Sequence, residues 1–159
     1  WYSRITHCAQ YIPAQARYAG VLAKQGRLED ARKHLRSIAP GDARQRMQLT
    51  LAEAALLREA QAYQEAFDFL AEAVARTPDS ADLLYDHAMA AEKVNRLDVL
   101  EANLRRVIEM QPDHAHAYNA LGYTLADRNL RLPEARVLIE TAHKLAPNDP
   151  FILDSLGWV

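Results

Sequence analysis

The sequence predicts an all-α protein that is built from a series of antiparallel helix pairs. Half of the 159 residues are hydrophobic and alanine is the commonest of these, whereas glycine and proline occur only five and seven times. Such a composition favours helices that pack closely. The alternating runs of Val, Ile and Thr that indicate strands are absent from the sequence. A third observation, the spacing of four proline motifs, divides the chain into units.

The four proline motifs separate the expected helix pairs. They read "APGDA", "TPDSA", "QPDHA" and "APNDP", and they contain Pro40, Pro78, Pro112 and Pro147. In each motif the proline ends one helix, and a polar residue that can cap the next helix follows. The interval is 34 residues from Pro78 to Pro112 and 35 residues from Pro112 to Pro147. A period near 34 is typical of a two-helix repeat.

The most regular unit lies between residues 115 and 149. Its signature positions are Tyr118, Leu121, Gly122, Leu125, Ala135, Ile139, Ala142 and Pro147. This pattern closely resembles a tetratricopeptide repeat, and the resemblance extends over nearly the whole chain, more strongly after residue 62 than before it. It implies a right-handed α-solenoid, the tetratricopeptide superhelix, with first helices on a concave face and second helices outside.

The resemblance implies a single array of about four repeats with partial helices at both ends. Residues 1–9 would be the tail of a preceding repeat, and repeats would follow at 12–40, 43–80, 81–114 and 115–149. Residues 150–159 would begin a truncated repeat. Within 81–114, His87 replaces the expected Leu and Leu100 replaces the expected small residue. The 115–149 unit has one additional residue in its inner turn, "DRNLRLPEA".

The proline motifs and the repeat pattern together predict ten helices along the chain. We expect them at roughly 2–9, 12–25, 28–38, 43–60, 63–76, 80–94, 97–110, 114–127, 132–145 and 149–158. Gly122 lies inside one of them, where glycine costs about 1 kcal/mol relative to alanine. We expect it to face Ala135 of the paired helix, because two small residues allow the two backbones to approach closely.

Charge and hydropathy argue against two classes of partner. The net charge is −2, and charges of both signs are mixed along the chain. This distribution leaves no basic face for nucleic acid. No apolar run reaches the roughly 18 residues of a membrane span, so we expect no direct membrane insertion. The chain begins without Met and ends within an apolar pattern, so we expect it to be a piece of a longer protein.

The sequence carries no motif for catalysis, a cofactor or a metal. Cys8 is the only cysteine and has no partner for an internal disulfide. His114 and His116 are two residues apart, a spacing that points them to different sides of a helix, and His114 fits a helix cap instead. No nucleophile elbow, phosphate-binding glycine loop or dinucleotide fingerprint is present. We therefore expect no enzyme activity, no cofactor and no metal site.

The resemblance also implies where a partner would bind. In this family, peptides are usually held by first-helix residues at fixed positions of each repeat. From the matching positions of this chain we select the candidate partner-binding residues Tyr85, Met89, His116, Asn119, Tyr123, Asp154 and Trp158. Tyr and Trp combine a large contact area with a polar group and are common interface anchors. The alternative is that the last of these side chains only cover a neighbouring repeat.

Three functions remain open from the sequence. The first is a protein–protein interaction scaffold that binds a peptide segment of a partner in its concave groove. The others are a regulatory or substrate-recruiting arm of a larger enzyme or envelope assembly, and a structural module that self-associates through exposed repeat ends. A clamp for an acidic peptide tail is not expected, because Asp82 and Asp86 would repel a carboxylate. The sequence pattern resembles that of bacterial repeat proteins. It is compatible with a location in the cytoplasm and with one in the cell envelope.

Overall fold

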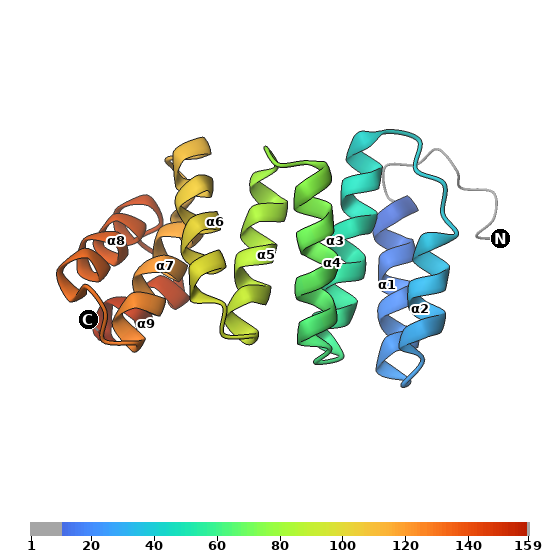
Figure 1. Ribbon diagram of the computed structural model, residues 1–159, viewed down its shortest axis with the longest axis horizontal. Coiled ribbons are helices and arrows are strands. Elements are labelled where there is room, and N and C mark those ends of the chain that lie inside the picture. Colours follow the sequence, from blue (N-terminus) through green and yellow to red (C-terminus); the bar gives the residue numbers. More distant parts are fainter. Residues whose placement is uncertain (1–10, 159) are drawn as a thin grey trace. The chain divides into compact units, whose positions relative to one another are not determined.

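The computed structural model describes residues 11–158. The helix expected at 2–9, together with Cys8, lies outside these residues. Within them every regular element is a helix and no strand is present. The helices, shown in Figure 1, are α1 (Tyr11–Lys24), α2 (Leu28–Arg36), α3 (Ala43–Glu59), α4 (Tyr63–Arg76), α5 (Ala81–Lys93), α6 (Leu97–Met110), α7 (Ala115–Asp127), α8 (Leu132–Leu145) and α9 (Pro150–Trp158).

The helices expected within the described residues are confirmed, with ends that differ by two residues at most. The largest difference is in α2, which ends at Arg36 although the pattern extends to residue 38. The polar residues after the prolines act as caps, as expected. Oδ1 of Asp42 accepts a hydrogen bond from the backbone N–H of Gln45 at 2.7 Å, at the start of α3. Nδ1 of His114 accepts one from the N–H of Ala117 at 3.1 Å, which explains that histidine as a helix cap.

The turn inside each helix pair repeats with high regularity. In each of the four turns the second residue after the first helix has a positive φ, namely Gly26 (78°), Gln61 (58°), Asn95 (58°) and Asn129 (55°). The N–H of the following residue donates to a carbonyl five residues earlier, as from Arg27 to Leu22 at 3.0 Å and from Leu130 to Leu125 at 2.8 Å. This bond defines a Schellman cap. The left-handed residues are 34 or 35 residues apart throughout, so they follow the repeat even where Pro40 and Pro78 are 38 residues apart.

The additional residue of the 115–149 unit is visible in its inner turn. Arg131 follows the turn residue Asn129 by two positions and adopts a left-handed conformation of its own, with φ of 44°, directly before α8. Its guanidinium pairs with Glu101 of α6. An ion pair to the preceding helix pair therefore accompanies the insertion.

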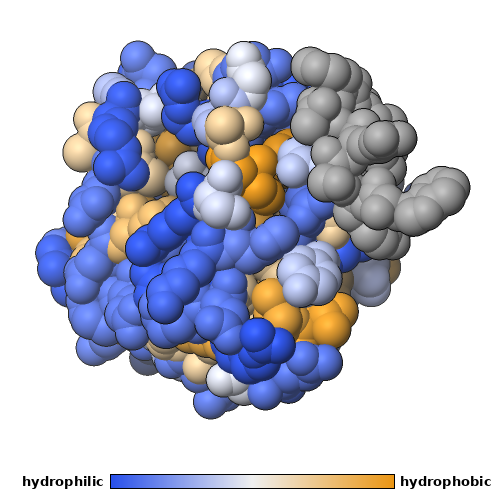
Figure 2. Space-filling model, turned by 90° about the vertical axis from the view of Figure 1, so that its right-hand side faces the viewer, coloured by the Kyte–Doolittle hydropathy of each residue, from blue (hydrophilic) through white to orange (hydrophobic). Residues whose placement is uncertain are grey.

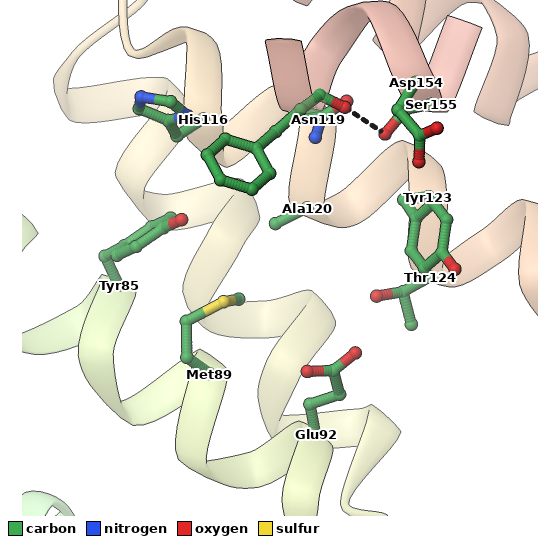
Figure 3. A pocket seen from close by; sticks show the side chains of 11 residues that line it. Tyr85, Met89, Glu92, His116, Asn119, Ala120, Tyr123, Thr124, Asp154 and Ser155 are labelled. Atoms are coloured by element: carbon green, nitrogen blue, oxygen red, sulfur yellow. Dashed lines mark hydrogen bonds between the residues drawn. The ribbon is translucent and has the colours of Figure 1, made fainter. Parts of the chain in front are cut away.

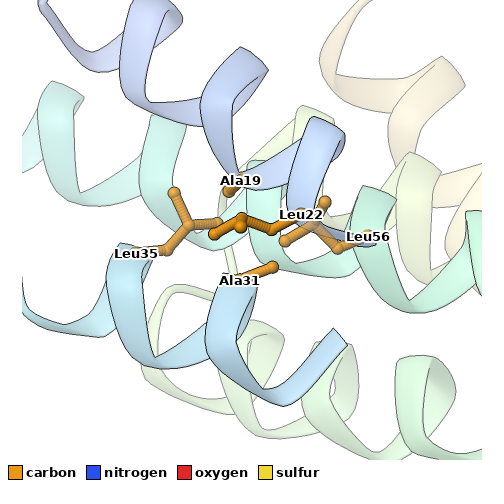
Figure 4. Packing of buried hydrophobic residues seen from close by; sticks show 5 residues of the cluster. All are labelled: Ala19, Leu22, Ala31, Leu35 and Leu56. Carbon is orange, nitrogen blue, oxygen red and sulfur yellow. The ribbon is translucent and has the colours of Figure 1, made fainter. Parts of the chain in front are cut away.

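The described part of the chain forms two compact units, one that ends at Ala73 and one that begins at Val74. In the first unit, α1, α2 and α3 share a hydrophobic cluster, which Figure 4 shows. Its buried members are Ala19, Leu22, Ala31, Leu35 and Leu56. In the second unit, the side chains that are fully buried come from α5, α6, α7, α8 and α9. Each unit thus has a core of its own, as expected for repeats that bury apolar surface against their neighbours.

Gly122 confirms the close approach predicted from its helix position. A Cβ atom at this residue would lie 2.7 Å from Cγ1 of Ile139 and 2.9 Å from the carbonyl oxygen of Ala135. Ala135 and Ile139 are themselves fully buried in α8. The glycine therefore allows α7 and α8 to pack at a distance that a methyl group would prevent.

The outer surface is chemically mixed. Figure 2 shows the face at the α1 and α2 end, where hydrophobic side chains form separate patches between hydrophilic ones. Tyr18 and Val21 of α1 are among the large hydrophobic residues that remain exposed. None of the helices within residues 11–158 combines the length and the apolar character that a membrane span requires.

Candidate functional site

The second unit contains a pocket of about 510 Å³ between α5, α7 and α9. α5 and α7 are the first helices of two successive helix pairs, and α9 follows the second pair. Figure 3 shows the pocket with its side chains. The lining residues are Tyr85, Met89, Glu92, His116, Asn119, Ala120, Tyr123, Thr124, Phe151, Asp154 and Ser155.

The spacing of these residues explains why they share one surface. On α5 the lining positions are Tyr85, Met89 and Glu92, which follow each other by four and three residues. Residues three or four apart lie on the same face of a helix. The same spacing recurs on α7 and α9, so each helix contributes one stripe to the pocket wall.

The structure places six of the seven candidate residues around this single pocket. They are Tyr85, Met89, His116, Asn119, Tyr123 and Asp154. Trp158 is not among the lining residues, and its surface is 67% exposed. The last turn of α9 therefore carries an exposed aromatic side chain outside the pocket.

His116 lines the pocket, and His114 contacts a residue that does. The ring of His114 lies 5.1 Å from the ring of Tyr85, measured between centroids. Nε2 of His116 lies 3.7 Å from Oδ2 of Asp149. The other oxygen of Asp149 accepts hydrogen bonds from the N–H groups of Phe151 and Ile152, at 2.9 and 3.2 Å. Asp149 therefore connects His116 to the start of α9.

The charged groups that line the pocket are carboxylates, and they lie beside neutral polar side chains. Oδ1 of Asn119 is buried and has no hydrogen-bond partner within the described residues. Glu92 and Asp154 contribute carboxylates, whereas the lining contains no lysine or arginine. Nζ of Lys93 lies 3.5 Å from Oε2 of Glu92, but Lys93 does not line the pocket. The wall thus combines negative charge with a free carbonyl-type acceptor.

Some lining residues were not among the candidates. Glu92 and Phe151 occupy first-helix positions that the family uses, so the resemblance pointed to these positions although neither residue was selected. Thr124 and Ser155 are only 5% and 4% exposed, and the hydroxyl of Ser155 donates to the carbonyl of Phe151 at 2.9 Å. No feature of the sequence distinguishes such small polar residues from other buried positions.

A second hollow, of about 480 Å³, lies in the first unit between α1 and α3. Its charged lining residues are Arg17, Lys24 and Glu59. The two hollows therefore differ in charge, since basic side chains line only this one. No three side chains of His, Asp or Glu converge in the part of the chain that the structure describes, as a metal site of that kind would require.

Comparisons with known proteins place the chain among repeat proteins. It is 43% identical over 158 residues to a TPR repeat-containing protein of Pseudomonas aeruginosa, a match that covers 99% of this chain and 27% of the relative. The chain therefore spans about a quarter of that relative's length. It is also 34% identical over 58 residues to bacteriophage adsorption protein A of Escherichia coli, which covers 36% of this chain and 6% of that protein. No family model matches the chain.

Solved structures with the same fold share less sequence. YrrB, described as a TPR protein with an unusual peptide-binding site, superposes with a TM-score of 0.69 at 18% identity, over 92% of this chain and 75% of that one. MamA RS-1 superposes with a TM-score of 0.71 at 18% identity, over 92% and 82%. The first TPR of Spaghetti, bound to the HSP90 peptide SRMEEVD, superposes with a TM-score of 0.63 at 19% identity, over 69% and 86%.

Proposed function

Because the chain belongs to the tetratricopeptide repeat proteins, we propose that it is a non-catalytic interaction module whose pocket between α5, α7 and α9 holds a segment of a partner protein. The observation that carries the proposal is the convergence of six candidate residues, chosen from three helices, on one pocket. Neighbours with this fold include a protein with a peptide-binding site and one bound to a peptide.

The dimensions and the chemistry of the pocket support a peptide segment. A volume of about 510 Å³ lies within the usual range for a binding site and accommodates a few side chains. Met89, Tyr85 and Tyr123 provide apolar and aromatic contact area, and Asn119 provides a hydrogen-bonding group. Aromatic anchors with a small number of placed polar groups are characteristic of protein interfaces.

The pocket does not favour the acidic segment seen in one neighbour. The peptide bound to Spaghetti ends in the sequence EEVD, in which three of the four residues are acidic. In this chain Glu92 and Asp154 line the pocket, and like charges brought together in an interface are unfavourable. The proposed partner segment is therefore not an acidic tail, in agreement with the expectation from Asp82 and Asp86.

Selection from a random peptide library tests the proposal. The protein would be immobilised, and the selected peptides would be titrated by fluorescence anisotropy against the wild type and a Tyr85→Ala/Tyr123→Ala variant. We expect affinity to fall at least roughly tenfold in the variant, because aromatic anchors dominate such interfaces.

Tyr18→Ala is a matched control, since Tyr18 is an exposed tyrosine of α1 that lies outside this pocket. It should bind the selected peptides as the wild type does. Circular dichroism would establish that all variants keep their helices. Equal affinity of the wild type and the pocket variant would contradict the proposal.

A further inference from the structure

The pocket between α5, α7 and α9 is lined by two acidic side chains and by no lysine or arginine. Two lining carboxylates, on Glu92 of α5 and Asp154 of α9, come from different helices. Neither belongs to an ion pair with an arginine among the described contacts, and only Lys93, beside Glu92 in sequence, approaches one of them. The two carboxylates thus leave a negative charge in the pocket that lining residues do not neutralise.

An aromatic ring lies with these carboxylates. In the view of Figure 3, Tyr123 stands between Asp154 and Glu92, with the carboxylate of Asp154 directed toward the side of the pocket where Tyr123 lies. Tyr123 is 37% exposed, so part of its ring is accessible. A cation placed over a tyrosine ring is attracted by the ring's quadrupole, and more strongly where water is excluded.

The neutral polar atom in the wall is also an acceptor. Oδ1 of Asn119 is buried without a partner within the described residues. A buried acceptor that remains unpaired is destabilising. The oxygen has almost no accessible surface, so a donor on a ligand reaches it only once the amide turns toward the pocket. Carboxylates, a carbonyl oxygen and an aromatic face all favour a group that carries positive charge and only donates hydrogen bonds.

We infer that the pocket recognises an arginine side chain of the partner segment, an inference that rests on the proposed function. The guanidinium has five N–H donors and no acceptor, and its plane can stack on a tyrosine ring. Its edge can therefore donate to a carboxylate of the pocket, that of Asp154 or of Glu92, and its face can stack on Tyr123. Met89 offers an apolar contact to the methylene stem.

The hollow of the first unit is a natural contrast. Arg17 and Lys24 line it together with Glu59, so a cationic side chain would meet like charge there. Recognition of arginine is thus assigned to the second unit alone. Glu59→Gln removes one carboxylate from the first hollow and serves as the matched control for changes of Glu92 and Asp154.

The test uses the peptides selected on the wild-type protein. We expect arginine to be enriched at one position. Replacing that arginine by glutamine should weaken binding roughly tenfold at low ionic strength, and less at high salt because exposed charges are screened. Glu92→Gln/Asp154→Asn should remove the preference for arginine over glutamine, whereas Glu59→Gln should retain it.

The outcomes separate the inference from the proposed function. Selected peptides that depend on Tyr85 and Tyr123 but show no arginine preference would overturn the inference and leave the proposed function standing. An arginine preference that persists in Glu92→Gln/Asp154→Asn would also overturn it, since another site would then read the charge. Peptides whose binding depends on neither tyrosine would contradict both.

Discussion

At the residue scale, Gly122 shows how one position can oppose helix propensity and still stabilise the fold. The residue lies inside α7, and the space for its missing Cβ is occupied by a side chain and a backbone oxygen of α8. Gly20 is also inside a helix, α1, but apart from its chain neighbours and the backbone of its own helix, no atom of the described residues lies within 4 Å of the position its Cβ would take. The two glycines therefore respond oppositely to the same substitution.

Gly122→Ala should lower the free energy of unfolding by about 1–2 kcal/mol, because overpacking costs about 1–3 kcal/mol and exceeds the gain in helix propensity. The carbonyl of Ala135 belongs to the backbone and cannot rotate away. Gly20→Ala, the control, should raise the free energy of unfolding by roughly 0.5–1 kcal/mol. Urea denaturation of both variants measures this, and a stabilised Gly122→Ala protein would contradict the packing argument.

His87 illustrates a departure from the repeat pattern that introduces pH dependence. The residue is 7% exposed, and its Nδ1 lies 3.0 Å from Nδ2 of Asn103. Burial lowers the pKa of His87 below its ordinary value of 6.5, and the positive charge of Arg96 lowers it further. The folded protein therefore holds this imidazole neutral at a pH at which the unfolded chain protonates it.

A pKa that is lower in the folded state contributes stability above pH 6.5, and this contribution is lost as the pH falls from 6.5 through the folded pKa. The free energy of unfolding of the wild type should thus fall between pH 7.5 and pH 5. The His87→Leu variant restores the residue expected in the family. Its free energy of unfolding should fall less over the same pH range. Denaturant titrations of both proteins at several pH values measure this. If the free energy of unfolding changed with pH equally in both, His87 would not titrate in this way.

At the element scale, the turns inside the helix pairs are set by left-handed residues rather than by glycine alone. Among the four, only Gly26 is a glycine, the residue that most readily adopts a left-handed conformation. Asn95 and Asn129 adopt this conformation at a smaller cost than most other residues. Gln61 has neither advantage, although it caps α3 with the same geometry. Its side chain therefore carries a conformational cost that the other three turns avoid or reduce.

Gln61→Gly should raise the free energy of unfolding by about 1 kcal/mol, because glycine removes the steric cost of a left-handed residue. Asn129→Gly is the matched control at the equivalent turn, and it should gain less, since asparagine visits this region more readily. Thermal unfolding followed by circular dichroism gives the comparison. A loss of stability in Gln61→Gly would refute the assignment of strain to this turn.

The packing of α2 on α3 depends on a buried carboxylate. Glu53 is 5% exposed and accepts hydrogen bonds from Nε of Arg32 at 3.0 Å and from Nε of Arg36 at 3.1 Å. Nη1 of Arg32 also donates to Glu65, whose side chain is 61% exposed. Sequence reasoning did not single out Glu53, because its surroundings come from another helix.

Glu53→Gln should lower the free energy of unfolding by about 2–4 kcal/mol, because it leaves two guanidinium groups without their shared buried partner. Glu65→Gln removes a carboxylate from the same arginine, Arg32, but at an exposed position, so it should cost less than about 1 kcal/mol. Denaturant titration of both variants in low salt tests this. Equal effects would show that burial does not set the strength of these pairs.

At the scale of the whole molecule, we expect local stability to differ between the two units. The described chain has one hydrophobic cluster in the unit that contains α1–α3 and another set of buried side chains in the unit that contains α5–α9. In repeat proteins, the effect of a change is largest in the repeat that carries it and in its nearest neighbours. Local unfolding can then occur at different free energies along one chain.

Leu35→Ala should reduce the protection of amide hydrogens against exchange mainly in α1, α2 and α3, because it removes a buried side chain from their cluster. Ile139→Ala is the reciprocal control in α8 and should reduce protection mainly in α7 and α8. Hydrogen exchange read by mass spectrometry distinguishes the two patterns. A uniform loss of protection along the chain in either variant would indicate one cooperative unit instead.

The sequence by itself determined the helices, their approximate ends, the repeat signature and the helix faces that carry Tyr85, Asn119 and Tyr123. These features follow from residues that are close along the chain, since propensity, capping and a three-to-four-residue period are local. Only the tertiary structure decided that Thr124 and Ser155 line the pocket, that Trp158 lies outside it and that Glu53 is buried. Those facts depend on contacts between helices that are far apart in the sequence, where each side chain's environment is supplied by residues that local patterns do not specify.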